Sequence, residues 1–259
     1  MSVAKKILVL LVVIALLIGG WFFMNKGANN AEAPVTTNET TSKTIDETGN
    51  MSTIEDSNKI MPSADSVSEK GEVKELPVIP ALGVRGVGDP NAPVQIQEFF
   101  SLTCNHCADF HTGTYQEIKS KYIDTGKVYF IFQEFPLNGP ALYGSMISRC
   151  LPSTRYASFI NLLLRNQDVW AYGGDFKAGL LQNAKLAGMS EEEFDACFNN
   201  TELQEALAQN ISASQEAYNV SSTPTFVFNN GARIMRGGKD IDAFKAVIEE
   251  LMNENTAAE

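Results

Sequence analysis

Hydrophobic and polar positions divide the chain of 259 residues into three parts. An apolar run covers residues 7–24 and is interrupted only by Gly19 and Gly20. The next tract, residues 27–75, is polar and contains no aromatic side chain. The remainder alternates short apolar segments with amphipathic ones, which predicts a folded unit of strands and helices.

The apolar run has the length of a membrane-spanning helix. Its residues would extend about 27 Å as a helix, close to the ~30 Å of a hydrocarbon core. A typical signal-peptide core is shorter, ~7–15 residues, and the one small-x-small site, residues 31–33, is followed by Pro34. Lys5 and Lys6 precede the run and favour an inside N-terminus. We therefore expect residues 1–26 to be an uncleaved signal anchor, with a cleaved signal peptide as the alternative.

The polar tract, residues 27–75, is predicted to be a disordered linker. It is rich in Thr, Ser, Asn, Glu and Asp, so it cannot bury enough apolar surface to offset the entropy lost on folding. Behind an anchor, such a linker would let a domain reach partners away from the bilayer. The folded unit is expected to begin near Leu76.

The first elements of the folded unit predict a βαβ arrangement. Residues 94–100 alternate and then become continuously apolar, as a strand does, and residues 128–132 form a second apolar run typical of a strand buried on both faces. Residues 104–123 between them predict a helix that ends near Gly126. The two strands should be parallel, with a right-handed crossover.

The next segment, residues 139–220, has helical patterning and predicts about five short helices. Its breaks and capping-box pairs are Pro152, Gly173-Gly174, Ser190 with Glu193, and Thr201 with Gln204. Residues 225–228 and 232–235 then predict a hairpin with an Asn-Gly tight turn, and residues 241–252 a closing helix. The order is βαβ, a helical block, and ββα.

Composition limits the class of partner. The net charge of −11 argues against nucleic acid, because phosphates are bound by Lys and Arg. With 44% hydrophobic residues, the chain suits one ordinary domain with tails or two small domains.

Two of the 4 cysteines form the motif Cys104-Asn105-His106-Cys107. Such a spacing marks a redox pair, half of a zinc site, or chance. A zinc site of four cysteines would also need Cys150 and Cys197, which are isolated and far apart. The motif follows a predicted strand, opens a predicted helix and lies outside a membrane, where disulfides persist, so the redox interpretation is favoured.

A helix start explains why Cys104 would be reactive. Its free N–H groups and partial positive charge stabilise a thiolate, which should lower the pKa of Cys104 below ~8.5. Cys107 is one turn further on and can close a disulfide. Stabilising the reduced form makes the couple oxidising.

Three other polar residues near the motif are candidates for the chemistry. His106 is expected to favour the Cys104 thiolate, with a solvated surface residue as the alternative. Glu98, a carboxyl on a buried strand, could accept the proton of Cys107; otherwise it is a strand-edge acid that faces water. His111 is expected to be a helix-surface or packing residue.

The segments 98–107 and 222–226 resemble the DsbA-like branch of the thioredoxin superfamily. The resemblance covers roughly residues 78–255 and implies an α/β thioredoxin fold with an inserted all-α subdomain, behind the anchor and linker. The thioredoxin-like domain would comprise residues 76–138 and 219–255, and the inserted helical domain residues 139–218.

The resemblance also implies roles for particular residues. The Thr223–Pro224 bond should be cis, with Pro224 packed against the motif, and the backbone of Thr223 should bind an extended substrate. Glu98 matches the acid six residues before the first catalytic cysteine. Asn105 departs from the oxidase motif, which usually has proline there, and this leaves the strength of the oxidant open.

Cys150 and Cys197 both fall in the helical block. In an oxidising compartment they most simply form a disulfide, as some DsbA-like proteins have; two free buried thiols are the alternative. Closing a loop of this size would stabilise the fold by roughly 4 kcal/mol on a chain-entropy argument.

The expected function is a dithiol oxidase that donates the Cys104–Cys107 disulfide to unfolded secreted proteins with free thiols. A DsbB-like quinone-linked membrane protein would reoxidise it, and the resemblance implies no cofactor or metal. The expected location is the bacterial periplasm or cell envelope, where the protein would be a monomer held at the inner membrane by residues 7–24. An isomerase or reductase, and a non-redox peptide-binding chaperone, are the alternatives.

Overall fold

The computed structural model describes residues 68–77 and 79–257. The predicted anchor, residues 1–26, and the linker as far as residue 67 lie outside this part of the chain. Among the described residues, no helix is long and apolar enough to cross a membrane.

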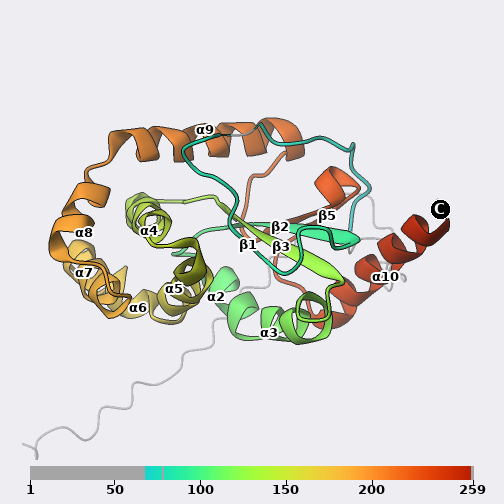
Figure 1. Cartoon of the computed structure of the whole chain (residues 1–259), viewed down its shortest axis with the longest axis horizontal. Helices are drawn as coiled ribbons and strands as arrows, with labels where there is room; N and C mark the ends of the chain where they lie inside the picture. The colour runs from blue at the N-terminus through green and yellow to red at the C-terminus, as the bar shows by residue number, and fades with distance from the viewer. Residues whose placement is uncertain (1–67, 78, 258–259) are drawn as a thin grey trace, which may run out of the picture. The chain divides into compact units, whose positions relative to one another are not determined.

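A mixed sheet of five strands forms the centre of the described unit, in the order β1-β3-β2-β4-β5 (Figure 1). β2 (Val94–Phe100) and β3 (Val128–Glu134) are parallel, which confirms the predicted βαβ unit. β4 (Thr225–Phe228) runs antiparallel to β2 and forms a hairpin with β5 (Arg233–Arg236). β1 (Gly86–Val87), which the sequence pattern does not predict, pairs antiparallel with β3.

The hairpin turn is longer than the predicted Asn-Gly tight turn. Phe228 pairs with Arg233, so four residues connect the strands. Asn229, Asn230 and Gly231 all have positive φ, at 43°, 54° and 109°. Asn and Gly tolerate this left-handed region better than other residues, which explains why they occur together here.

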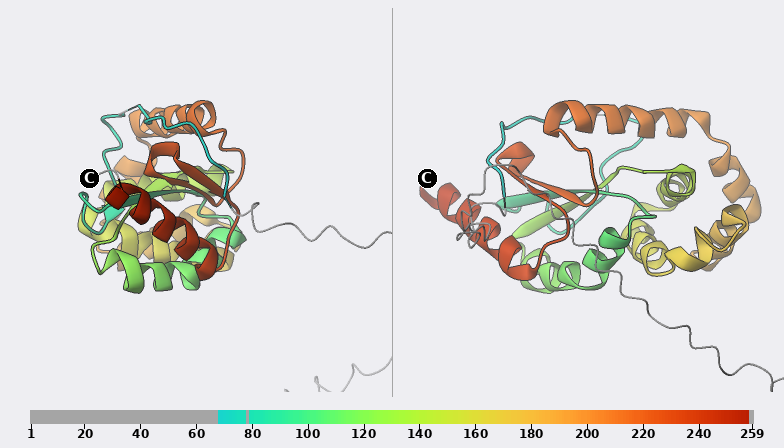
Figure 2. Two further views of the ribbon diagram at one scale, coloured as in Figure 1. Left: turned by 90° about the vertical axis from the view of Figure 1, so that its right-hand side faces the viewer. Right: turned by 180° about the vertical axis from the view of Figure 1, so that it is seen from behind.

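Helices cover both faces of the sheet (Figures 1 and 2). On one face lie α2 (Asn105–Thr112), α3 (Thr114–Ile118), the π-helical turn Lys119–Ile123 and α10 (Ile241–Ala257). The single helix predicted over residues 104–123 is therefore interrupted at Gly113. α9 (Thr201–Tyr218) covers the opposite face.

Between β3 and β4 the described chain forms six helices, where about five were predicted. Besides α9 they are α4 (Gly139–Cys150), α5 (Ser153–Arg165), α6 (Gln167–Trp170), α7 (Phe176–Leu186) and α8 (Glu191–Phe198). The breaks fall at Pro152 and at Gly173-Gly174, as predicted.

One of the two predicted capping boxes is present. Ser190 and Glu193 cap α8 reciprocally. The box predicted at Thr201 is wrong, because Asn200 caps α9 by accepting a 2.9 Å hydrogen bond from the backbone N–H of Leu203. Asn is at least as good an N-cap as Thr, so the helix begins one residue earlier than predicted.

The main core lies on the face covered by α2 and α10 and is rich in aromatic rings. Phe110 packs against Phe226 with ring centroids 4.6 Å apart and against Phe244 at 5.5 Å. All three rings are buried, and buried aromatic rings supply much of the apolar surface area whose burial stabilises a domain. They also fix α2, and with it the CxxC motif, against the sheet.

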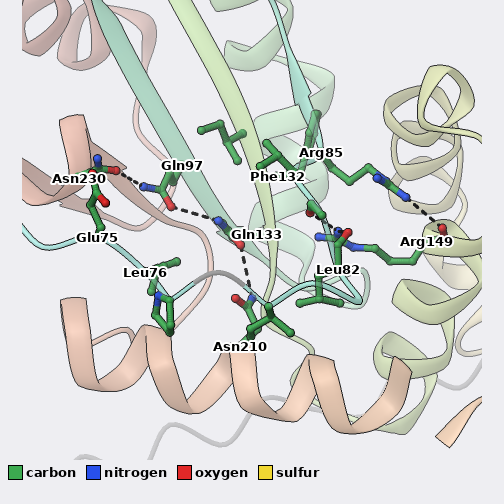
Figure 3. Close-up of a pocket in the computed structure, with 15 residues that line it drawn as sticks. Glu75, Leu76, Leu82, Arg85, Gln97, Phe132, Gln133, Arg149, Asn210 and Asn230 are labelled. Atoms are coloured by element: carbon green, nitrogen blue, oxygen red, sulfur yellow. Dashed lines mark hydrogen bonds between the residues drawn. The ribbon is translucent and has the colours of Figure 1, made fainter. Parts of the chain in front are cut away.

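The opposite face of the sheet carries a row of side-chain amides (Figure 3). Gln97 donates to Asn230 at 2.9 Å and accepts from Gln133 at 3.1 Å, and Asn210 of α9 lies 3.5 Å from Gln133. They border a cavity of about 230 Å³. Because successive strand residues face opposite sides, Gln97 belongs to this face while Glu98 points toward α2.

The described chain joins the sheet earlier than predicted. Glu69 and Ile234 exchange two backbone hydrogen bonds of 2.7 Å, and Lys74 donates to the carbonyl oxygen of Asn230 at 2.7 Å. The expected start of the folded unit near Leu76 is therefore too late. The polar side chains of residues 27–75 predict a linker, but backbone hydrogen bonds do not depend on side-chain polarity. The end of this polar tract can therefore pair with the sheet.

A buried ion pair connects the helical block to the sheet. The guanidinium of Arg149 in α4 donates to both carboxylate oxygens of Glu134 at the end of β3, and Tyr156 of α5 donates to the same carboxylate. All three side chains are buried. Burial, with the nearby Glu134 charge, raises the pKa of Tyr156 well above its usual value.

Candidate active site

Cys104 occupies the N-cap position of α2. Its backbone is extended (φ −92°, ψ 118°), and its carbonyl oxygen accepts the first helical hydrogen bonds, from the N–H groups of Cys107 and Ala108, both at 3.1 Å. Its side chain is half-buried, so the sulfur has access to solvent. The opening turn of α2 therefore lies beside the sulfur, where the partial positive charge of a helix start favours a thiolate.

The thiol of Cys104 is strongly acidic. A hydrogen bond from the Cys107 thiol is the largest influence that lowers the pKa of Cys104, to about 5. Partial burial opposes it, while the side chain of Thr223 and the backbone N–H groups of Cys107 and His106 lower the pKa further. The predicted direction of the shift is confirmed; the partner thiol contributes more than the helix start alone.

Cys107 has the opposite character. Its side chain is fully buried, and this burial, together with Cys104 and the negative charge of Glu98, raises its pKa well above 9.0. At neutral pH the pair therefore consists of a half-buried thiolate and a fully buried thiol. Both cysteines are free in this structure.

Glu98 is completely buried, so the alternative of a strand-edge acid facing water is wrong. Its Oε2 lies 2.7 Å from Nε2 of His111, and its Oε1 has no hydrogen-bond partner among the described residues. His111 is 1% exposed, which excludes a helix-surface position. The packing position is therefore the one found, and the contact with Glu98 could not be predicted because nothing in the local pattern links the two residues.

Thr223 faces Cys104 from the loop before β4. The Thr223–Pro224 peptide bond is cis, as predicted, and both residues are buried. The thiol of Cys104 donates to the carbonyl oxygen of Thr223 at 3.4 Å. The loop before β4 and the start of α2 thus come together at the reactive sulfur.

His106 is exposed, and its ring makes no hydrogen bond to any described residue. Its backbone N–H, rather than the ring, contributes to lowering the pKa of Cys104. The predicted contribution of the ring stays a prediction.

Two residues of the helical block that the sequence does not single out hold the loop before Cys104. The buried amide of Gln167 donates to the carbonyl oxygens of Leu102 and Cys104, at 2.9 and 3.1 Å. The hydroxyl of Tyr172 donates to the carbonyl oxygen of Thr103 at 2.7 Å. These contacts span more than sixty positions of sequence, so no local pattern could have identified them.

The remaining cysteines form a disulfide between Cys150, at the end of α4, and Cys197 of α8, with Cα atoms 6.3 Å apart. The alternatives of two free thiols and of a zinc site with four cysteines are therefore wrong. Among the described residues, no group of His, Cys, Asp or Glu side chains is arranged to hold a metal ion.

The fold and the pair of unlike cysteines define a thioredoxin-fold protein with a dithiol site. The family model described as "Thioredoxin" matches residues 83–250. The chain is 30% identical to alpha-DsbA1 of Wolbachia pipientis, covers 96% of it with 71% of its own length, and superimposes with a TM-score of 0.64. The chain belongs to the thioredoxin family, and within that superfamily it is DsbA-like.

Two further comparisons agree with this assignment. BdbD of Bacillus subtilis shares the fold with a TM-score of 0.59 at 20% identity, covering 71% of this chain and all of BdbD. A relative from Rickettsia conorii, named as a protein-disulfide oxidoreductase, is 32% identical over 169 residues, or 65% of this chain. The chain spans 60% of the length of that relative and of the one from Rickettsia felis.

Proposed function

We propose that this protein is a thiol–disulfide oxidoreductase that acts as a dithiol oxidase. A substrate thiolate attacks Sγ of Cys104 in the disulfide form, the Cys104–Cys107 bond breaks, and the leaving electron pair goes to Cys107, which takes up a proton. A second substrate thiolate then attacks the substrate sulfur of the mixed disulfide and releases Cys104 as a thiolate. The substrate loses two electrons and gains a disulfide, and the enzyme is left as a dithiol.

The observation that carries this proposal is the contrast between the two sulfurs. Cys104 has its pKa lowered to about 5, so it is a good leaving group at neutral pH, while Cys107 is buried with a raised pKa. A stabilised thiolate favours the reduced enzyme, which makes the disulfide form an oxidant. The names of the Rickettsia relatives support the same activity.

The surroundings of Cys104 support an unfolded polypeptide as substrate. The backbone carbonyl of Thr223 lies next to the sulfur, where an extended peptide could pair with it as a strand does. Tyr172, just after α6, is 55% exposed and contacts the residue before Cys104. A hydrogen bond to the carbonyl oxygen of Thr103 fixes the ring of Tyr172 close to the motif. An apolar side chain of the substrate could pack against this ring while its thiolate reaches Cys104.

The proposal also covers where the protein works and which partner reoxidises it. We infer that the domain works in the periplasm or cell envelope, held by the apolar run at residues 7–24, and that a DsbB-like quinone-linked membrane protein reoxidises it. The length of that run supports the anchor. The Cys150–Cys197 disulfide supports an oxidising compartment.

The test is a disulfide-transfer assay with a reduced, unfolded protein of several cysteines. The disulfide form should oxidise the substrate and appear stoichiometrically as the dithiol, and Cys104→Ala should abolish the transfer. Equilibration with glutathione separates oxidase from reductase, since a reductase would have a potential near that of thioredoxin, about −270 mV. A Cys104→Ala variant that protects unfolded chains as well as the parent would support a non-redox chaperone instead.

A further inference from the structure

His111 is a buried histidine whose two ring nitrogens both lie near oxygen atoms. Nε2 is 2.7 Å from Oε2 of Glu98 on β2, and Nδ1 is 3.1 Å from Oδ1 of Asn161 on α5. The side chain thus connects the strand before the CxxC motif to the helical block. Its own helix, α2, begins at Cys104.

Asn161 determines which ring nitrogen of His111 must carry a hydrogen. The amide nitrogen of Asn161 donates to the carbonyl oxygen of Ala157 at 2.8 Å, so the amide oxygen is the atom that faces the ring. An amide oxygen can only accept, and Nδ1 must therefore carry a hydrogen. At Nε2 two arrangements satisfy the 2.7 Å contact: an imidazolium that donates to an ionised Glu98, or a neutral ring that accepts from a protonated Glu98.

The groups around this pair give it little other charge compensation. The aromatic rings with centroids within 6.3 Å of the imidazole are those of Phe100, Phe110, Tyr115 and Phe132. The titratable groups that face the pair are Cys107 from α2 and Tyr115 from α3, whose pKa values are raised by burial first and also by Glu98. Lys119 and Arg165 border the cavity of about 570 Å³ that Asn161 lines.

A buried ion pair in an apolar environment is costly. A charged His111 beside Glu98 has a use, however, if Cys107 must give up its proton within the protein. When Cys107 must act as a nucleophile, its thiol has to lose a proton inside the protein. Transfer of that proton to Glu98 beside an imidazolium replaces a carboxylate by a thiolate, and the net charge of the three groups stays at zero. Without the imidazolium, the same site would carry an uncompensated negative charge.

We propose that His111 is a positioning residue that holds Glu98 ionised, with Oε1 free to receive the proton of Cys107. This inference rests on the proposed redox function. It applies when a mixed disulfide on Cys104 is resolved: the S–H bond of Cys107 breaks, the proton goes to Glu98, and the sulfur attacks Sγ of Cys104. The partner leaves as a thiolate, and the Cys104–Cys107 disulfide forms.

The test follows this resolving step alone. The dithiol protein is converted at Cys104 to a mixed disulfide with cysteamine, and release of the free thiol is recorded between pH 5 and 9. In His111→Gln, Glu98 either takes up a proton and can no longer accept one, or stays charged and opposes ionisation of Cys107. Both effects should move the pH profile upward by at least one unit, and release at pH 7 should be about tenfold slower.

Two further variants separate this role from packing. Tyr115→Phe keeps the ring 4.8 Å from the imidazole and should leave the profile unchanged. Asn161→Leu removes the acceptor that fixes Nδ1–H and should give a smaller shift in the same direction. An unchanged profile in His111→Gln would overturn the proposal.

A measurement on the unaltered protein covers the case in which His111→Gln does not fold. Nitrogen chemical shifts of His111 should show both ring nitrogens protonated at pH 7, and a neutral ring would overturn the proposal. Failure of the redox function is a distinct result, because the parent protein would then neither release cysteamine nor oxidise a substrate.

Discussion

The sulfur of Cys104 lies 3.4 Å from the carbonyl oxygen of Thr223, although 119 positions of sequence separate the two residues. This contact joins the start of α2 to the loop before β4. It places the reactive sulfur against the backbone of the loop that contains the cis Thr223–Pro224 bond. The acidity of Cys104 should therefore respond to changes on both sides of the contact.

Replacing Cys107 by alanine should raise the pKa of Cys104. The Cys107 thiol makes the largest contribution to the lowered pKa of about 5. The loss of this hydrogen bond should move the pKa upward by one unit or more, while the backbone N–H groups keep it below its ordinary value of about 8.5. Alkylation rates of Cys104 measured against pH would report the shift, and an unchanged midpoint would show that the partner thiol is unimportant.

Thr223→Val should also raise the pKa of Cys104, by a smaller amount. The substitution removes the buried hydroxyl, which helps to lower the pKa, but keeps the backbone carbonyl and the branched shape. Ser222→Ala, at the exposed position before it, is the matched control and should have no effect. Equal shifts in both variants would indicate a general disturbance of the loop.

The parts of the fold that the sequence predicts are those with a local physical cause. Residues 94–100 and 128–132 show strand patterning, and β2 and β3 occur at those positions. Cys104 stands where a strand ends and a helix starts, so its acidity follows from local geometry. The strands of the final hairpin also follow from alternation and turn residues.

The parts that the sequence does not predict depend on contacts between distant segments. β1 has two residues, too few for a periodicity, and forms because β3 offers an edge. Asn161 and Gln167 reach the site from α5 and α6, and Tyr172 from the segment after α6, and no local pattern specifies how these parts pack. For His111 the sequence predicts only a helix-surface or packing residue, because its partner Glu98 lies on another element.

The stability of the dithiol form relative to the disulfide form should decrease in acid. In the folded dithiol form the pKa of Cys104 is about 5, below the ordinary value in an unfolded chain. Between these two pKa values the folded dithiol form binds fewer protons than the unfolded chain, so ionisation of Cys104 stabilises the folded form. This stabilisation is complete above the unfolded pKa and is lost as pH falls through about 5. Cys107, with its raised pKa, is protonated in both states over this range and does not contribute.

This pH dependence can be measured by urea unfolding of both redox forms at pH 7 and pH 4. The free energy of unfolding of the dithiol form minus that of the disulfide form should be smaller at pH 4. A difference that does not change with pH would mean that no thiolate stabilises the folded dithiol form.

Removal of the second disulfide should destabilise the fold. Cys150 and Cys197 are 47 positions apart, and the bridge between them restricts the unfolded chain. The double variant Cys150→Ala/Cys197→Ala should lose roughly 2–4 kcal/mol of unfolding free energy in urea. Leu186→Ala, an exposed position in the same block, should change it by less than about 0.5 kcal/mol. A double variant as stable as the parent would contradict the entropic argument.

The titration of Cys104 itself is the most direct test of the account, because the proposed chemistry depends on that sulfur being a thiolate. Thiolate absorbance of the dithiol form, followed from pH 3 to 10 and compared with Cys104→Ala, isolates this one group. The account predicts a transition centred near pH 5 that is absent from the variant. A transition near 8.5, the ordinary value for a free cysteine, would contradict it.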